Sequence, residues 1–213
     1  MFSTEHSGGR RFSVAVAVAS AGGLDAFTTL LASLPHAFPI PIVVAQHLGP
    51  TQTSCFVDIL QVRTGLRVCW ARDGQPLEPS TVFIGPPGCH TLIAGNRLLI
   101  TPVRERVLNG RPSGDLLLSS AALSYGSETL GIVLSGYLND GARGAQIIRH
   151  VGGVVIVQDP CTAKVPEMPQ ASMNAGPVDF IVPLPLIPAA LIALAMKPGA
   201  AELFCGQARA ASN

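Results

Sequence analysis

Charged residues are scarce in this chain of 213 residues: Asp, Glu, Lys and Arg together make up 13% of it, and the formal net charge is +1. With 48% apolar residues, such a composition excludes a globally disordered chain. The nearly balanced charge gives no sign of a nucleic acid or an acidic membrane as partner. We expect one domain of ordinary size that can bury a substantial core.

Long apolar runs are also missing. The run Val14–Ala19 and the segment 184–196 are far shorter than the roughly 20 residues that a membrane-spanning helix needs. No apolar stretch is placed as a secretory signal peptide requires. The sequence therefore predicts no membrane insertion.

Cysteine pairs and nucleotide-binding motifs are absent too. No two of the five cysteines have C-x-x-C spacing, so neither a zinc site nor a disulfide framework is indicated, and a reducing, cytoplasmic location fits best. Gly22 and Gly23 form a glycine-rich turn that could bind phosphate at a helix start. The patterns G-x-G-x-x-G and G-x-x-x-x-G-K-[ST] do not occur, however, so a nucleotide site is a weak hypothesis.

What the chain does have is a regular alternation of short apolar runs with helical patterns, which predicts the α/β class. Most runs are continuous in Val and Ile, which indicates a doubly wound, Rossmann-like, mostly parallel sheet of about seven strands. Within 81–101, two apolar runs flank the turn sequence Ala-Gly-Asn-Arg, which predicts an antiparallel β-hairpin at one edge of the sheet. The predicted strands cover 13–18, 42–46, 67–70, 81–84, 98–101, 131–134, 154–157 and 180–182; the predicted helices cover 24–34, 53–63, 114–125, 142–150, 168–174 and 186–196.

Three side chains that could take part in catalysis follow three of the predicted strands. Ser20, His47 and Asp140 are a nucleophile, a general base and an acid, separated by 27 residues (47 − 20) and 93 residues (140 − 47). In open α/β sheets, ligands bind beyond the carboxyl ends of the strands, so the fold could bring all three together. This set of side chains is typical of acyl transfer through a serine nucleophile.

Each of the three residues also has a purely structural interpretation. Ser20 precedes two glycines and could cap the helix that follows. His47 could be an ordinary loop residue, and Asp140 could cap the helix predicted at 142–150. The window Val-Ala-Ser-Ala-Gly around Ser20 also lacks the first glycine of the G-x-S-x-G elbow, so this is not an ordinary α/β-hydrolase motif.

Seven segments between residues 13 and 194 are more specific than any of these single features. They are "ASAGGLDAF", "VVAQHLGP", "DGQPLEPSTVFIGPPGCH", "RPSGDLLLSSAA", "GIVLSGYLNDGARG", "GGVVIVQD" and "EMPQASMNAGPVDFIVPL". Because these segments occur in the same order as in the family, the chain resembles the catalytic domain of the CheB-type chemotaxis protein-glutamate methylesterases. The family's catalytic triad falls on Ser20, His47 and Asp140.

The resemblance implies a serine hydrolase that removes methyl groups from γ-glutamyl methyl esters on the cytoplasmic helices of methyl-accepting chemoreceptors. It also implies deamidation of certain receptor glutamines through the same acyl-enzyme. His47 would accept the Ser20 proton, and Asp140 would orient and stabilise the imidazolium. No metal or organic cofactor is needed. We expect the backbone N–H groups of Ala21 and Tyr137 to bind the oxyanion.

The sequence departs from the family pattern near two of these residues. Ala21 stands where the family usually has a polar residue such as Thr, and Tyr137 and Leu138 stand where it has Met and Gly. Tyr137 either fills the space of the Met or forms a hydrogen bond. If the backbone at Leu138 is left-handed, a residue other than glycine costs about 1–2 kcal/mol there, and the turn that carries Asp140 could be reshaped.

Family members typically also carry a phosphorylatable receiver domain that controls the active site. We expect a catalytic domain at 13–196 between flexible ends at 1–12 and 197–213, with no receiver domain in this chain, since twelve residues are too few for one. Control would then be absent or come from a regulatory protein acting in trans. The one local basic cluster, Arg104, Arg106 and Arg111, is either a solvated loop or a docking patch for an acidic receptor surface.

Two other functions remain open from the sequence. The first is a binding or scaffold module of the same fold, in which Tyr137 and Leu138 have impaired catalysis. The second is an esterase or amidase whose substrate lies outside chemotaxis.

Overall fold

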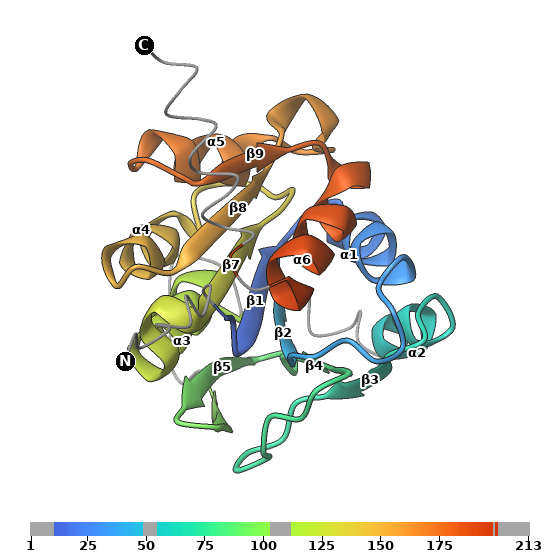
Figure 1. Ribbon diagram of the computed structural model, residues 1–213. Helices are drawn as coiled ribbons and strands as arrows, with labels where there is room; N and C mark the ends of the chain where they lie inside the picture. Colours follow the sequence, from blue (N-terminus) through green and yellow to red (C-terminus); the bar gives the residue numbers. More distant parts are fainter. Residues whose placement is uncertain (1–10, 49–54, 103–111, 198, 200–213) are drawn as a thin grey trace, which may run out of the picture.

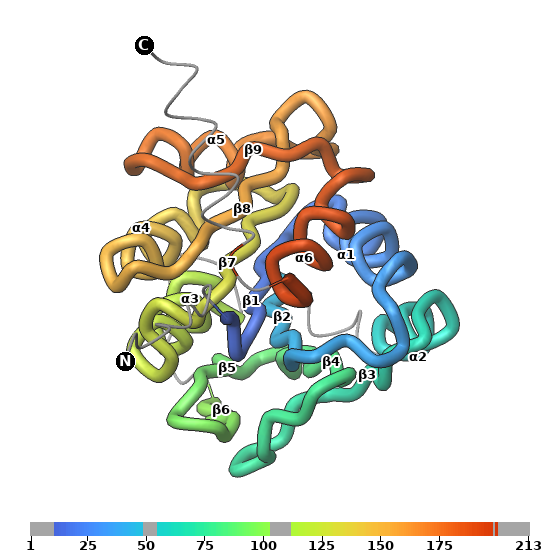
Figure 2. The backbone as a smooth tube through the Cα atoms, in the orientation of Figure 1, coloured from blue at the N-terminus to red at the C-terminus, as the bar shows by residue number. Residues whose placement is uncertain are grey.

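The computed structural model describes residues 11–48, 55–102, 112–197 and 199. Seven parallel strands form a central sheet in the order β3-β4-β2-β1-β7-β8-β9, with helices on both faces (Figures 1 and 2). This confirms the predicted doubly wound α/β class. The strands of this sheet are β1 (Val14–Ala19), β2 (Ile42–Gln46), β3 (Arg67–Trp70), β4 (Thr81–Ile84), β7 (Thr129–Val133), β8 (Val154–Gln158) and β9 (Phe180–Val182).

The helices divide between the two faces. Residues of α1, α2 and α6 pack in one hydrophobic cluster, and residues of α3, α4 and α5 pack in a second cluster across the sheet. Because strands of the sheet contribute to both clusters, the sheet is covered on both sides, as continuous Val and Ile runs predict. The α-helices are α1 (Gly23–Ala32), α2 (Phe56–Gln61), α3 (Gly114–Tyr125), α4 (Ala142–His150), α5 (Glu167–Asn174) and α6 (Ile187–Met196); short 3₁₀ turns occupy Gly126–Glu128, Pro160–Thr162 and Leu184–Leu186.

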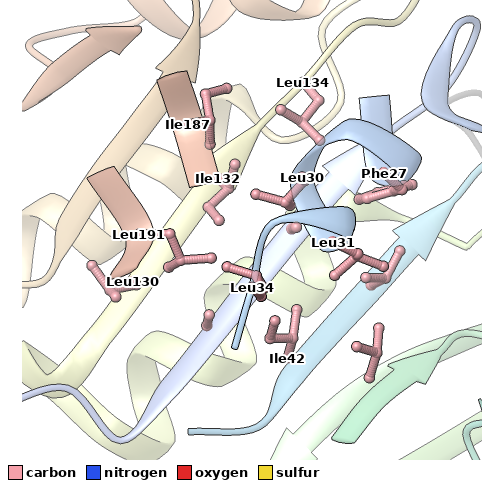
Figure 3. Close-up of a cluster of buried hydrophobic side chains, with 14 of the residues drawn as sticks. Phe27, Leu30, Leu31, Leu34, Ile42, Leu130, Ile132, Leu134, Ile187 and Leu191 are labelled. Atoms are coloured by element: carbon pink, nitrogen blue, oxygen red, sulfur yellow. The ribbon is translucent and has the colours of Figure 1, made fainter. Parts of the chain in front are cut away.

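Strand β1 contributes side chains to the hydrophobic clusters on both faces of the sheet. Successive side chains of a strand point to opposite faces. The three valines of β1 lie in the cluster under α3 and α4, and its three alanines lie in the cluster under α1 and α6. The small alanines leave room for the leucines of α1, and Figure 3 shows Leu30 of α1 and Leu191 of α6 in the same cluster of buried side chains on this face.

The predicted hairpin forms, but it is not an edge of the main sheet. Strands β5 (Cys89–Ala94) and β6 (Arg97–Pro102) pair with each other in a separate two-stranded sheet. The backbone of Ile93 in β5 is bound by α3 instead of by another strand: its N–H donates to Ser120 Oγ and its carbonyl oxygen accepts from Ser124 Oγ, both at 3.0 Å. These serines satisfy backbone groups that an edge strand would have offered to the sheet.

Several predicted boundaries move by a few residues. The helix predicted at 53–63 is found at Phe56–Gln61, and residues 49–54 lie outside the described part of the chain. The expected flexible ends at 1–12 and 197–213 fall mostly outside it as well. None of the helices in the described ranges is long and apolar enough to cross a membrane.

The topology places a functional site before any side chain is considered. Strand β1 lies between β2 and β7, and the chain reverses its direction of winding between β1 and β7. Ligands of doubly wound sheets bind at this kind of switch point, beyond the carboxyl ends of the strands. Residues that follow β1, β2 and β7 are therefore the candidates for chemistry.

Candidate active site

Ser20, His47 and Asp140 follow these three adjacent strands. Ser20 comes directly after β1, and its N–H donates to the carbonyl oxygen of Ser135 after β7, at 2.9 Å. His47 comes directly after β2, and its N–H donates to the carbonyl oxygen of Ala19 at 3.1 Å. Backbone pairing thus continues past the strand ends and holds the two loops in register.

The imidazole and the carboxylate are in direct contact. His47 Nε2 lies 2.7 Å from Asp140 Oδ2, and the Asp140 side chain is 2% exposed while that of His47 is 17% exposed. Ser20 and His47 line the same cleft, of about 750 Å³, so the imidazole separates a buried carboxylate from a site open to substrate. Within the described residues the Ser20 hydroxyl makes no hydrogen bond, to His47 or to any other group.

The purely structural interpretation of Ser20 does not hold. The residue that caps α1 is Gly22, with a left-handed backbone (φ 82°), and no side chain caps this helix. Ser20 therefore stands two residues before the cap, in the turn between β1 and α1. A Cβ added to Gly136 would come within 2.7 Å of Ser20 Cβ, so the glycine lets the two loops touch.

The carboxylate of Asp140 accepts hydrogen bonds from residues at the start of α3. Its Oδ2 accepts from Gly114 N–H at 2.6 Å, and its Oδ1 accepts from Asp115 N–H at 2.9 Å and from Ser113 Oγ at 3.3 Å. Burial by itself would raise the pKa of Asp140, but the hydrogen bonds from His47, Asp115 and Gly114 outweigh it and lower that pKa below its usual value of 3.8. The carboxylate is therefore ionised beside the imidazole.

Two residues that sequence reasoning missed connect the loops of the site. Gln46 Nε2 donates to the carbonyl oxygens of Ser20 (2.8 Å) and His47 (3.1 Å), which ties the ends of β1 and β2 together. Ser135 Oγ donates to the carbonyl oxygen of Ala21 at 2.7 Å and accepts from Val165 N–H at 2.9 Å. Both follow or end a strand, so the same search at strand ends could have found them.

Comparison with known proteins identifies the family. The family model described as CheB methylesterase matches residues 15–191. The chain belongs to the CheB methylesterase family. FrzG of Myxococcus xanthus, named a protein-glutamate methylesterase, is 38% identical over 179 residues, and a Thermotoga maritima protein-glutamate methylesterase/protein-glutamine glutaminase is 33% identical over 184 residues.

The match covers the catalytic part of the CheB methylesterases. The crystal structure of the CheB methylesterase catalytic domain of T. maritima superposes with a TM-score of 0.80 at 33% identity, over 86% of this chain and 98% of that one. The chain spans about half the length of FrzG (53%) but 86% of a Leptospira interrogans relative that is 35% identical. The CheB catalytic fold is thus shown for this chain.

The departures from the CheB pattern have clear structural consequences. Leu138 has a left-handed backbone (φ 65°), the conformation for which the family glycine is suited, and its side chain is 60% exposed. Its N–H donates to Glu167 Oε2 at 2.7 Å, a contact that sequence reasoning did not anticipate. The Tyr137 side chain is 57% exposed, so the ring does not fill a buried space. The turn is left-handed at this leucine, and Asp140 contacts His47 two residues further on.

The other predicted residues lie as follows. Ala21 lines the cleft beside Ser20, and Tyr137 follows Gly136, which contacts Ser20. In the described part of the chain, no acceptor is found for the N–H of Ala21 or of Tyr137. The basic cluster Arg104, Arg106 and Arg111 lies outside the described residues.

Proposed function

We propose that this protein is a serine hydrolase that demethylates γ-glutamyl methyl esters on the cytoplasmic helices of chemoreceptors, and that it deamidates glutamines there by the same route. The observation that carries the proposal is the 2.7 Å bond between His47 and the buried Asp140, in a cleft that also contains Ser20. The names of two relatives, protein-glutamate methylesterase and protein-glutamate methylesterase/protein-glutamine glutaminase, support methylated glutamates and glutamines of a protein as the substrates. We take Ser20, His47 and Asp140 as the catalytic residues.

The proton path follows from the nitrogen that Asp140 binds. Because Nε2–H of His47 donates to Asp140, the free lone pair of the neutral imidazole is on Nδ1. Nδ1 is therefore the base that accepts the Ser20 proton as the hydroxyl attacks the ester carbonyl. The imidazolium that results keeps its bond to the Asp140 carboxylate, which stabilises it electrostatically.

The acyl-enzyme forms and breaks down by the same groups. His47 returns its proton to the departing methoxide, and methanol leaves. A water then attacks the acyl-enzyme while His47 accepts its proton; the bond to Ser20 breaks, His47 gives that proton to the Ser20 oxygen, and the glutamate side chain is released. For a glutamine, the leaving group is ammonia and the remaining steps are the same.

Backbone donors complete the proposed site. The N–H groups of Ala21 and Tyr137, from the two turns that meet at Gly136, would bind the oxyanion of the tetrahedral intermediate. Removal of one such donor in a comparable site costs about 10²–10³ in kcat, so we expect these turns to contribute substantially, although less than the nucleophile.

The test is methanol release from methyl-labelled chemoreceptor. We expect Ser20→Ala to lower turnover by about 10⁴–10⁶, because the nucleophile of a triad acts as a unit with its base. The exposed serine at the end of α1 offers a matched control, and Ser33→Ala should release methanol at the wild-type rate. Equal, near-background release by wild type and Ser20→Ala would reject receptor demethylation.

A serine-directed reagent then separates the two alternative functions. A scaffold module with an impaired site would not be labelled at Ser20 by diisopropyl fluorophosphate. A hydrolase with a substrate outside chemotaxis would be labelled but would leave methylated receptor unchanged.

A further inference from the structure

Asp115 is a second carboxylate beside the proposed triad; it is partly buried, and the mechanism above does not use it. It lies in the first turn of α3, and burial raises its pKa, an effect that the N–H of Gly144 opposes and the negative charge of Asp140 increases. Placing two acidic side chains this close together is unfavourable in itself. The hydrogen bonds of Asp115 show what offsets this unfavourable interaction.

Asp115 and Asp140 bind the starts of each other's helices. Asp140, two residues before α4, accepts from the Gly114 and Asp115 N–H groups at the start of α3. Asp115 Oδ1 in turn accepts from Gly141 N–H at 3.0 Å and from Gly144 N–H at 2.8 Å, at the start of α4. No side chain caps α4 at its N-cap residue, Gly141, so Asp115 supplies the carboxylate that this helix start favours.

Asp115 therefore holds the Asp140–Gly141 unit at two points. Its N–H donates to Asp140 Oδ1, and its carboxylate accepts from the next residue, Gly141. The distance from Asp140 Oδ2 to His47 Nε2 depends on where this unit sits relative to α3. A shift of the unit along α4 would move the carboxylate away from the imidazole.

Close packing makes the arrangement rigid. A Cβ added to Gly114 would lie 2.9 Å from Val18 Cγ1 and 3.2 Å from Asp140 Oδ2, and one added to Gly144 would lie 2.5 Å from Leu118 Cβ. The two helix starts thus approach as closely as glycine allows, and Asp115 lies between them.

We propose that Asp115 is a positioning residue, which clamps the Asp140–Gly141 turn to α3 and so keeps the Asp140 carboxylate in line with His47. This inference rests on the proposed hydrolase function. It assigns Asp115 no contact with substrate and no proton transfer. What matters is an acceptor oxygen at the place of Oδ1, not the charge.

Three substitutions separate position from charge. Asp115→Asn keeps an acceptor oxygen at the same place without the charge, Asp115→Glu keeps the charge but displaces the oxygens by one methylene, and Asp115→Ala removes both. The readouts are kcat and KM for p-nitrophenyl acetate and the rate at which diisopropyl fluorophosphate labels Ser20. Asp73→Ala is the matched control, since Asp73 also accepts a backbone N–H, that of Ile100 at 2.9 Å, in the hairpin region.

We expect Asp115→Ala and Asp115→Glu to lower kcat and the labelling rate by about 10- to 100-fold with little change in KM, as a misplaced catalytic group does. Asp115→Asn and Asp73→Ala should stay close to wild type. If Asp115→Ala does not fold, the comparison of Asn with Glu decides alone.

Two results would overturn the proposal: a fully active Asp115→Ala, which would leave Asp115 a role in stability only, or an active Glu variant with an inactive Asn variant, which would show that charge matters. Failure of the hydrolase function has a different signature. In that case Ser20→Ala would hydrolyse p-nitrophenyl acetate as fast as wild type, and wild type would not be labelled at Ser20, whatever the Asp115 variants do.

Discussion

Leu138 has a backbone conformation that is unfavourable for a leucine. A left-handed φ of 65° brings Cβ close to the following carbonyl oxygen, while the exposed side chain gains little from burial. The bond from its N–H to Glu167 Oε2 offsets part of this cost. The strain lies two residues from Asp140 and is absorbed without breaking the contact of Asp140 with His47.

We expect Leu138→Gly to stabilise the protein by about 1 kcal/mol, the difference between the strain it relieves and the extra chain entropy of glycine. Urea denaturation followed by circular dichroism measures the free energy of unfolding. Tyr137→Gly is the control, because Tyr137 has no positive φ and its replacement should only destabilise. An unchanged or lower stability of Leu138→Gly would mean that the leucine makes favourable contacts that outweigh its backbone strain.

At the scale of the elements, the crossing of α3 and α4 determines the geometry around Asp140. Gly144 faces Leu118 where the two helices touch, and its N–H also donates to Asp115. A helix interior normally favours alanine over glycine by about 1 kcal/mol. A glycine at position 144 therefore indicates that the lack of space between the helices, and not helix propensity, determines the residue at this position.

Gly144→Ala should therefore destabilise the protein by about 1–2 kcal/mol, because the new Cβ, 2.5 Å from Leu118 Cβ, forces the helices apart. The exposed neighbour provides the comparison: Arg143→Ala on the same helix should change the free energy of unfolding by less than about 0.5 kcal/mol. Thermal or urea unfolding of both variants gives the answer, and equal stabilities would show that α4 is not held this closely against α3.

At the scale of the whole molecule, the buried carboxylate of Asp140 and the partly buried one of Asp115 link folding to pH with opposite signs. The pKa of Asp140 is lowered in the folded state, so its ionised form stabilises the fold above pH 3.8, and this contribution is lost as the pH falls below that value. The pKa of Asp115 is raised, so its contribution is favourable at low pH and is lost as the pH rises above 3.8.

The stability of two variants should show this difference. Relative to wild type, Asp140→Asn should be less stable at pH 7, and the gap should narrow as the pH is lowered to 3. Asp115→Asn should be at least as stable as wild type at pH 7, since it retains the acceptor without the cost of a partly desolvated charge, and should lose this advantage at pH 3. Urea unfolding at both pH values tests the pair, and a gap for Asp140→Asn that is the same at both would contradict the assigned linkage.

The general arrangement of the fold and of the candidate site followed from local patterns. Continuous apolar runs predicted the parallel strands, and the first polar residue after β1 and after β2 proved to line the cleft. Ser20 and His47 could be predicted in this way because ligands of such sheets bind at the carboxyl ends of the strands, and strand direction follows from the sequence. The hairpin was predicted as an element but placed wrongly, since Ser120 and Ser124, which bind its backbone, lie about 30 residues further along the chain.

What the sequence by itself determined is therefore the class of fold, the order of its elements and the three residues that follow its central strands, because periodicity and strand direction are local properties of the chain. Only the tertiary structure decided which hydrogen-bonding groups pair with one another around the site. Asp115 in "SGDLLL" reads as an ordinary acidic residue in the first turn of a helix, and nothing local shows that it binds a helix start 26 residues later. Such contacts depend on how closely two helices approach, and that distance is set by packing across the sheet.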